Sequence, residues 1–118
     1  SGPAYFFLMV EALVDAGVDQ GLTRSVATEL AVQTMAGAAA MLLERLDDAT
    51  PNGDSAMGVT VDTSPAQLRA TVTSPGGTTA AGLRELERSG LRTAVANAVN
   101  AAKMRSEQLG KQLGITPE

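Results

Sequence analysis

Apolar side chains recur near the start of this chain at the three- and four-residue spacing of an amphipathic helix. One face of that helix would carry Phe6, Phe7, Val10, Leu13 and Val14. Pro3 suits the first helical position, and Gly17 suits the left-handed position that follows a helix. We therefore predict a first helix from just after Ser1 to about residue 16.

A second, longer apolar stripe follows Thr23, whose side chain suits the cap of a helix N-terminus. The predicted helix runs to about Leu46 and, at 1.5 Å per residue, would be roughly 34 Å long. Its centre, residues 36–40, reads Ala-Gly-Ala-Ala-Ala and is nearly bare of side chain. Its stripe consists of Ala27, Leu30, Ala31, Thr34, Met35, Ala38, Met41 and Leu42.

Residues 47–63 are polar and rich in glycine and proline, which predicts a surface insertion or flexible loop. A weak strand signal at residues 58–61 lies within it. The third helix is expected to start at Ser64, with Pro65 at its first position and Gln67 completing a capping box.

Two further helices are predicted in the last third of the chain. The fourth runs from about residue 78 to 89 and stops at Gly90, and the fifth runs from about residue 91 to 109 and ends at Gly110. The face of the fifth helix consists of Leu91, Val95, Ala98, Val99 and Ala102. The fold class is therefore all-α, a helical bundle of about five helices.

Alanine accounts for 20 of the apolar residues, which make up 44% of the chain. A buried leucine or phenylalanine contributes about 1.5–3 kcal/mol, and an alanine contributes much less. A long helix with a bare centre also favours another helix pressed against it. We expect the bundle to be interlocked with a second subunit in a homodimer, and a monomeric bundle is the alternative.

Charge is distributed unevenly along the chain, whose formal net charge is −4. Residues 1–62 carry nine acidic and two basic side chains, a net charge of −7, whereas residues 63–118 carry four acidic and seven basic ones, a net charge of +3. Two such halves suit mutual packing, within one chain or across a dimer, although two solvated helix faces of unequal charge remain the alternative. The acidic total argues against a nucleic-acid partner.

The composition excludes several chemistries. The chain has no Cys, His or Trp, which leaves no thiol nucleophile, Cys/His metal site or imidazole acid–base group. Only three residues, Tyr5, Phe6 and Phe7, are aromatic, so little is available to stack on nucleic-acid bases. The apolar runs fall short of the ~20 residues of a membrane span, and no signal peptide is visible. We therefore expect no nucleic-acid, membrane or metal partner and a cytoplasmic location.

The sharpest local feature is residues 73–79, which read Thr-Ser-Pro-Gly-Gly-Thr-Thr immediately before the fourth helix. Two glycines allow close backbone approach, and a helix start presents unpaired N–H groups to a carboxylate or phosphate. The hydroxyls of Ser74, Thr78 and Thr79 surround it. No lysine follows Gly77, so this is not a Walker A loop. A well-capped turn without a ligand is the alternative interpretation.

Two weaker candidates involve carboxylates. Residues 48–54 superficially resemble a calcium loop, but the spacing is wrong and Val59 stands where a bidentate glutamate is needed. Glu11 and Asp15 lie one helical turn apart, and an exposed acidic face is the expected outcome for them. The adjacent aromatics, Tyr5, Phe6 and Phe7, favour a core or an interface.

Several segments together resemble the C-terminal domain of pyrroline-5-carboxylate reductase. The most specific is residues 72–79, Val-Thr-Ser-Pro-Gly-Gly-Thr-Thr, followed by Gly82-Leu83 and Leu86-Glu87. Residues 1–5, Ser-Gly-Pro-Ala-Tyr, resemble the entry into the family's first dimerisation helix. The resemblance extends over about residues 1–46 and 65–109.

The resemblance implies reduction of 1-pyrroline-5-carboxylate to L-proline with NADPH or NADH, the last step of proline biosynthesis. It implies that Ser74, Gly77 and Thr78 hold the substrate carboxylate and that Gly76 also belongs to the substrate-binding residues. Thr79 would hydrogen-bond the ring nitrogen as the catalytic residue. The substrate, a small molecule with one carboxylate, would lie at the interface of a homodimer. The hydride would come from the nicotinamide, so no His or Cys is required.

The sequence departs from the family pattern in two respects. Residues 47–63 make the connector longer than usual, and no Gly-x-Gly-x-x-Gly fingerprint after a strand is present. The resemblance thus implies that residues 1–118 form one C-terminal domain, without the Rossmann domain that would bind the cofactor, and that this chain alone is inactive. The alternative function is a non-catalytic helical dimerisation or interaction module.

Overall fold

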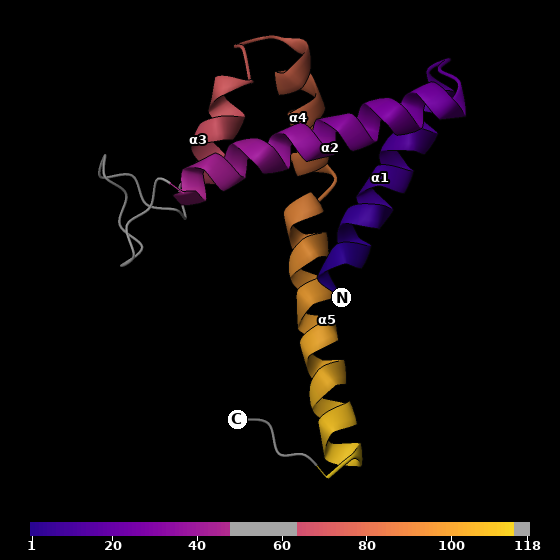
Figure 1. Ribbon diagram of the computed structural model, residues 1–118, viewed down its shortest axis with the longest axis vertical. Helices are drawn as coiled ribbons and strands as arrows, with labels where there is room; N and C mark the ends of the chain where they lie inside the picture. Colours follow the sequence, from indigo (N-terminus) through magenta and orange to yellow (C-terminus); the bar gives the residue numbers. More distant parts are fainter. Residues whose placement is uncertain (48–63, 115–118) are drawn as a thin grey trace. The chain divides into compact units, whose positions relative to one another are not determined.

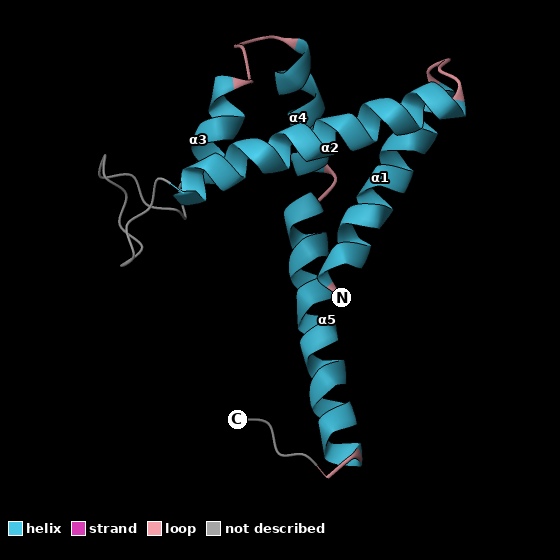
Figure 2. Ribbon diagram, in the orientation of Figure 1, coloured by secondary structure: helices cyan, strands magenta, loops and turns pink. Residues whose placement is uncertain are grey.

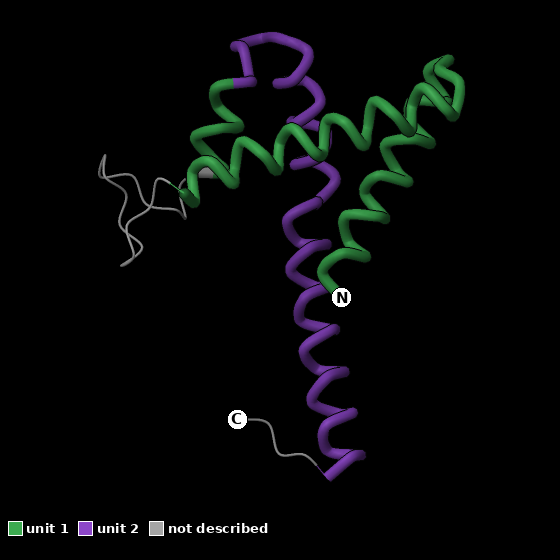
Figure 3. The backbone as a smooth tube through the Cα atoms, viewed as in Figure 1, with its two compact units in different colours: residues 1–71 green, residues 72–118 purple. Residues whose placement is uncertain are grey.

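The computed structural model describes residues 1–47 and 64–114. It contains five α-helices, and the described ranges contain no strand (Figure 2). The prediction of an all-α fold is therefore confirmed for these residues. The weak strand signal at 58–61 and nearly all of the predicted insertion fall outside them. The chain divides into two compact units, Ser1–Thr71 and Val72–Glu118, each considered separately below (Figure 3).

The first unit is built on a pair of helices, α1 (Gly2–Asp19) and α2 (Arg24–Asp47), with the short helix α3 (Ser64–Thr71) in contact with α2. Figure 1 shows α1 and α2 meeting at the turn that joins them and diverging from there. The Thr23 hydroxyl accepts a hydrogen bond from the N–H of Val26 at 3.2 Å. This bond confirms the predicted cap of α2, because it satisfies one of the N–H groups left over at a helix start.

The core of this unit lies between α1 and α2 close to their turn. Val14, Ala27 and Ala31 are buried, and Val10 and Val18 pack against them at the edge. No other residue in the described part of the chain is buried. In the rest of the predicted α2 stripe, Met35 is half-buried and the other residues, Leu30 and Met41 included, are exposed in a single copy.

Gly17 was expected to end the first helix, and that expectation is wrong. Helix α1 continues to Asp19, and the glycine with positive φ is Gly21, at +108°. A Cβ added at Gly17 would lie 3.1 Å from Cβ of Ala27 and 3.4 Å from Cδ1 of Leu22. At Gly17, therefore, α1 approaches α2 closely, and the absence of a side chain permits that approach.

The second unit contains α4 (Thr78–Arg88) and α5 (Leu91–Gln112). Gly90, with φ of +81°, separates them as predicted. The predicted end of the last helix at Gly110 is wrong, because α5 continues to Gln112 and the left-handed glycine is Gly114. Neither helix has a buried residue.

Helix α2 also has the length and apolar composition of a helix that crosses a membrane. Core helices of soluble proteins can have the same length and apolar composition, so these two properties alone do not show that α2 crosses a membrane. The exclusion of a membrane partner stays a prediction.

Candidate functional site

The glycine-rich segment before α4 forms a tight β-turn. The N–H of Gly77 donates to the carbonyl oxygen of Ser74 at 3.1 Å, which closes the turn. Pro75 occupies its second position and Gly76, with φ of +70°, occupies its third. Proline at the second position and a glycine of positive φ at the third are typical of a type II turn. The sequence Ser-Pro-Gly-Gly therefore dictates this local shape.

Gly77 is the residue at which the turn passes into the helix. It is the N-cap of α4, in an extended conformation with φ of −87° and ψ of −177° that other residues also adopt. A Cβ at this position would lie 3.3 Å from the Ser74 carbonyl oxygen and 3.4 Å from the Ser74 Cβ. The tight fold of the turn, rather than its dihedral angles, is thus the reason that glycine fits here.

The first turn of α4 presents backbone N–H groups that the helix cannot use. The N–H of Ala81 bonds to the carbonyl of Gly77 at 3.1 Å, so the N–H groups of Thr78, Thr79 and Ala80 precede the first helical carbonyl available to them. No side chain caps this end, and the first turn carries no acidic residue. The positive end of the helix dipole therefore faces this turn, which suits an anion.

The predicted site residues lie together at this place. Ser74, Gly76, Thr78 and Thr79 are exposed, and Gly77 is half-buried. Three hydroxyl groups thus accompany the free N–H groups, and both kinds of donor can reach a carboxylate or a phosphate. These residues are neighbours in the sequence, so no packing between distant segments is needed to bring them together.

Ion pairs hold the other end of α4. Nε of Arg92 lies 2.8 Å from Oε1 and 3.0 Å from Oε2 of Glu87, which links α4 to α5 across Gly90. The hydrogen bond to Glu87, together with its negative charge, raises the pKa of Arg92 above its ordinary value. Arg88 also pairs with Glu85 on α4, at 2.6 Å. All four side chains are exposed, so these pairs steady the helix ends rather than form a buried network.

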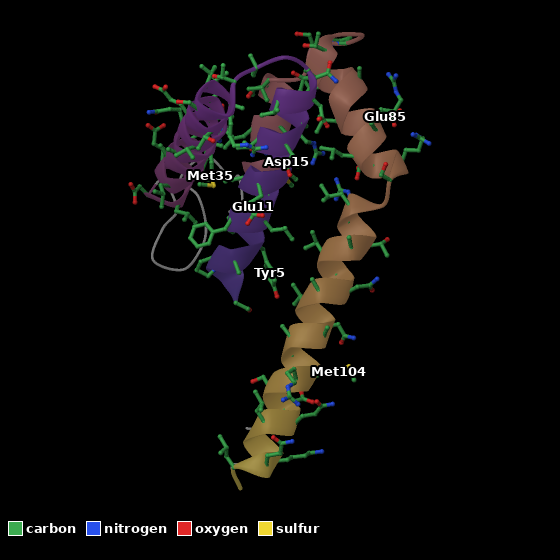
Figure 4. The ribbon with its side chains drawn as sticks, turned by 90° about the vertical axis from the view of Figure 1, so that its right-hand side faces the viewer. Tyr5, Glu11, Asp15, Met35, Glu85 and Met104 are labelled. Carbon is green, nitrogen blue, oxygen red and sulfur yellow. The ribbon has the colours of Figure 1, made fainter. Side chains whose placement is uncertain are left out.

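The two carboxylates singled out on the first helix have different surroundings. Glu11 and Asp15 both lie along α1 and are labelled in Figure 4. Asp15 accepts a hydrogen bond from Nη1 of Arg24 at 3.1 Å, so it joins α1 to the start of α2. Glu11 and Asp15 are both exposed, as predicted, and Asp15 in addition pairs with Arg24. The described residues contain no cluster of three or more metal-ligating side chains.

A family model described as "Pyrroline-5-carboxylate reductase dimerisation" matches residues 1–109. A protein named pyrroline-5-carboxylate reductase from Mycobacterium leprae is 72% identical over 92% of this chain and 37% of its own length. One of the same name from Mycobacterium tuberculosis is 68% identical over all of this chain and 39% of its own length. The chain thus spans well under half the length of these relatives.

Two solved structures are similar to this chain in fold. Plasmodium falciparum pyrroline carboxylate reductase with NADP bound matches with a TM-score of 0.73 and 37% identity, over 92% of this chain and 36% of that one. A pyrroline-5-carboxylate reductase from Coxiella burnetii matches with a TM-score of 0.73 and 42% identity, over 92% of this chain and 34% of that one.

Proposed function

This chain belongs to the pyrroline-5-carboxylate reductase dimerisation family, and we propose that it is the substrate-binding and dimerisation part of an enzyme that reduces 1-pyrroline-5-carboxylate to L-proline with NAD(P)H. The observation that supports this proposal is the turn before α4, where free N–H groups and hydroxyls meet at the positive end of a helix. The substrate carries one carboxylate, which is the kind of group that such a turn binds. The relatives are named as an enzyme, which does not favour the alternative of a non-catalytic interaction module.

The proposed roles follow from the order of residues along the turn. The backbone at Gly76 and Gly77 lets the substrate approach closely, and the Ser74 and Thr78 hydroxyls donate to its carboxylate together with the Thr78 N–H. Thr79 lies one residue further into α4, where its exposed hydroxyl can hydrogen-bond the ring nitrogen. Fixing the carboxylate and the nitrogen orients the ring, so that the carbon to be reduced faces a hydride donor.

The described residues do not fit a dinucleotide site. They contain no strand, and the sequence has no glycine fingerprint following one. We propose that a separate Rossmann domain binds NADPH or NADH, which supplies the hydride when bound. The isolated chain is therefore expected not to oxidise NADPH in the presence of 1-pyrroline-5-carboxylate. Turnover by this chain alone would contradict the proposal that a separate domain binds the cofactor.

A homodimer is the proposed assembly. A dimerisation family points to homo-oligomerisation. Among the described residues, a single copy leaves most large apolar side chains exposed, including Phe6, Phe7 and Leu30. Monomeric soluble proteins rarely leave large apolar surfaces uncovered. Light scattering should report about twice 12.0 kDa at micromolar concentration, and a particle of 12.0 kDa would refute the dimer. We further expect a soluble protein in the cytoplasm, without a nucleic-acid or membrane partner.

Binding of the carboxylate is tested by nuclear magnetic resonance of the backbone amides. Adding L-proline, the reaction product, should shift the amide signals of Thr78, Thr79 and Ala80 and raise the melting temperature. Gly77→Asp should abolish both effects, because a carboxylate would stand where the ligand binds. Gly82→Asp is the matched control, since a Cβ at Gly82 meets no atom within 4 Å.

Three outcomes separate the interpretations. Shifts confined to the start of α4 and lost in Gly77→Asp support the substrate site. Equal shifts with inorganic phosphate and none with proline would replace it by a phosphate site. No shift with either ligand would leave the turn as a helix cap and refute the proposed substrate site.

A further inference from the structure

The connection between α4 and α5 is very short. Helix α4 ends at Arg88 and α5 begins at Leu91, and Figure 1 shows one helix leading directly into the other. Gly90, the N-cap of α5, donates its N–H to the carbonyl oxygen of Glu87 at 3.1 Å. We refer to residues 88–91 as the α4–α5 junction. The direction of α4 relative to α5 depends on this junction and on the contacts that span it.

One side-chain contact spans the junction. Neither helix has a buried residue, so no buried apolar contact fixes the direction of α4 in the described part of the second unit. Glu87 on α4 pairs with Arg92 on α5, whose Nε lies 2.8 Å from Oε1 and 3.0 Å from Oε2. The other ion pairs within residues 72–114 each lie inside a single helix. The Glu87–Arg92 pair is therefore the ion pair that joins the two helices.

The signs of these two charges are the opposite of those that each helix favours by itself. A helix dipole favours negative charge near the N-terminus and positive charge near the C-terminus. Glu87 lies in the last turn of α4, and Arg92 lies in the first turn of α5. Neither charge therefore stabilises its own helix through the dipole. Their interaction across the junction is the favourable one, which indicates that the pair serves the connection between the helices.

The candidate site at the other end of α4 is incomplete on α4 alone. Ser74, Thr78 and Thr79 are exposed, whereas binding sites for small molecules usually cover most of the ligand. The surfaces that cover the substrate ring must therefore lie outside this turn, and their distance from it depends on the direction of α4. Eleven residues at 1.5 Å each make α4 roughly 16 Å long, so a tilt of about 10° at the junction moves the turn by about 3 Å.

We propose that the Glu87–Arg92 ion pair fixes the direction of α4 and thereby positions the turn at residues 74–79 against the rest of the substrate site. Both are positioning residues, because they lie at the opposite end of α4 from the turn that binds the ligand. The inference rests on the proposed function and adds to it two residues that act through the helix. The pair is exposed, so its loss should weaken the binding of L-proline by only about two- to fivefold.

Residual dipolar couplings measure the direction of α4 relative to α5. N–H and Cα–Hα couplings are recorded in an uncharged stretched gel for the unsubstituted chain, Glu87→Gln, Arg92→Gln and Glu85→Gln. The last is the matched control, because it breaks an ion pair of similar exposure that lies within α4. One common alignment of both helices is expected in the unsubstituted chain and in the control, and a weaker alignment of α4 in the two junction variants. Unchanged couplings in the junction variants, or an equal loss in the control, would overturn the proposal.

Ligand titrations followed by nuclear magnetic resonance test the consequence for the site. Acetate is a carboxylate without a ring, so it needs only the turn and should bind all four proteins equally. The dissociation constant of L-proline should rise about two- to fivefold in Glu87→Gln and Arg92→Gln but not in Glu85→Gln. Unchanged binding of L-proline, or an equal loss for acetate, would overturn the positioning role. Failure of the unsubstituted chain to bind L-proline would instead refute the substrate site of the proposed function, and the couplings would then decide on the ion pair alone.

Exchange of the two charges separates positioning from helix stability. The double variant Glu87→Arg, Arg92→Glu restores the pair and should restore both the common alignment and the affinity for L-proline. Glu87→Gln alone removes a charge that the dipole of α4 disfavours, so its melting temperature should change little. Should Glu87→Gln lose its helical circular dichroism signal, Arg92→Gln breaks the same pair from the other helix and decides the question. A double variant whose α4 stays as weakly aligned as in the single variants would overturn the proposal.

Discussion

Replacing Gly17 by alanine should destabilise the protein, although the same change in most helices stabilises it. An alanine in a helix interior is favoured over glycine by roughly 0.8–1.0 kcal/mol. At Gly17, however, the new methyl group would lie 3.1 Å from Cβ of Ala27, well inside the usual carbon–carbon separation of about 3.5–4.0 Å. Ala27 is 4% exposed and its methyl group cannot rotate away, so the two helices must separate.

The gain in helix propensity and the cost of the clash with Ala27 have opposite signs, so their magnitudes decide the net change in stability. Overpacking of a core typically costs about 1–3 kcal/mol. Subtracting the gain in helix propensity leaves a net loss of about 1 kcal/mol in the free energy of unfolding. Gly82→Ala is the internal control, because a Cβ at Gly82 meets no atom within 4 Å. It should gain about 0.8 kcal/mol, so the two alanine variants should differ by nearly 2 kcal/mol.

A double-mutant cycle isolates the contact. Ala27→Gly removes the facing methyl group, so in the double variant the alanine at position 17 has room again. The cycle of Gly17→Ala with Ala27→Gly should give a favourable coupling energy of about 1–2 kcal/mol. Urea denaturation followed by circular dichroism provides the free energies, at one fixed protein concentration because the stability of a dimer depends on it. Equal stabilisation by Gly17→Ala and Gly82→Ala, with no coupling, would refute the close approach of α1 and α2.

Three other substitutions test local features by the same denaturation assay. Thr23→Ala should lower the free energy of unfolding by about 1 kcal/mol, because the N–H of Val26 loses its cap, and Thr23→Ser should retain most of it. Asp15→Asn should change the free energy of unfolding by less than about 1 kcal/mol, because both side chains of the Asp15–Arg24 ion pair are exposed. A larger loss of stability would mean that a partner subunit buries this ion pair. Gly90→Ala should cost about 1–2 kcal/mol, since its φ of +81° is unfavourable for a side chain, and no loss would mean that the turn between α4 and α5 has another conformation.

Features encoded by neighbouring residues could be predicted from the sequence. The cap at Thr23, the stop at Gly90 and the turn before α4 each depend on a few consecutive residues, and the structure has them where they were expected. The same holds for the geometry of the candidate site, because its donors come from one turn and the start of one helix. The roles assigned to Ser74, Gly76, Gly77, Thr78 and Thr79 stay predictions until ligand binding is measured.

Features that depend on distant residues could not be predicted in this way. A glycine after an apolar run suits the end of a helix, and both Gly17 and Gly110 were interpreted so, yet each lies inside one. For Gly17 the deciding contact is with Ala27, ten residues along the chain on another helix. The small residues at 17, 27 and 31 were visible in the sequence, but their spacing alone does not say which helices they bring together. The ion pair between Asp15 and Arg24 likewise joins two helices, and the sequence alone did not predict it.

The sequence by itself determined the helical class, most helix boundaries, and the donors gathered at the start of α4, because hydrogen bonds and dihedral preferences within a few residues decide them. Only the tertiary structure decided that α1 runs on through Gly17, that the core of one copy is confined to a few residues beside the α1–α2 turn, and that a groove opens beyond it. These properties depend on the distance between two helices, and that distance is set by side chains that meet across the fold.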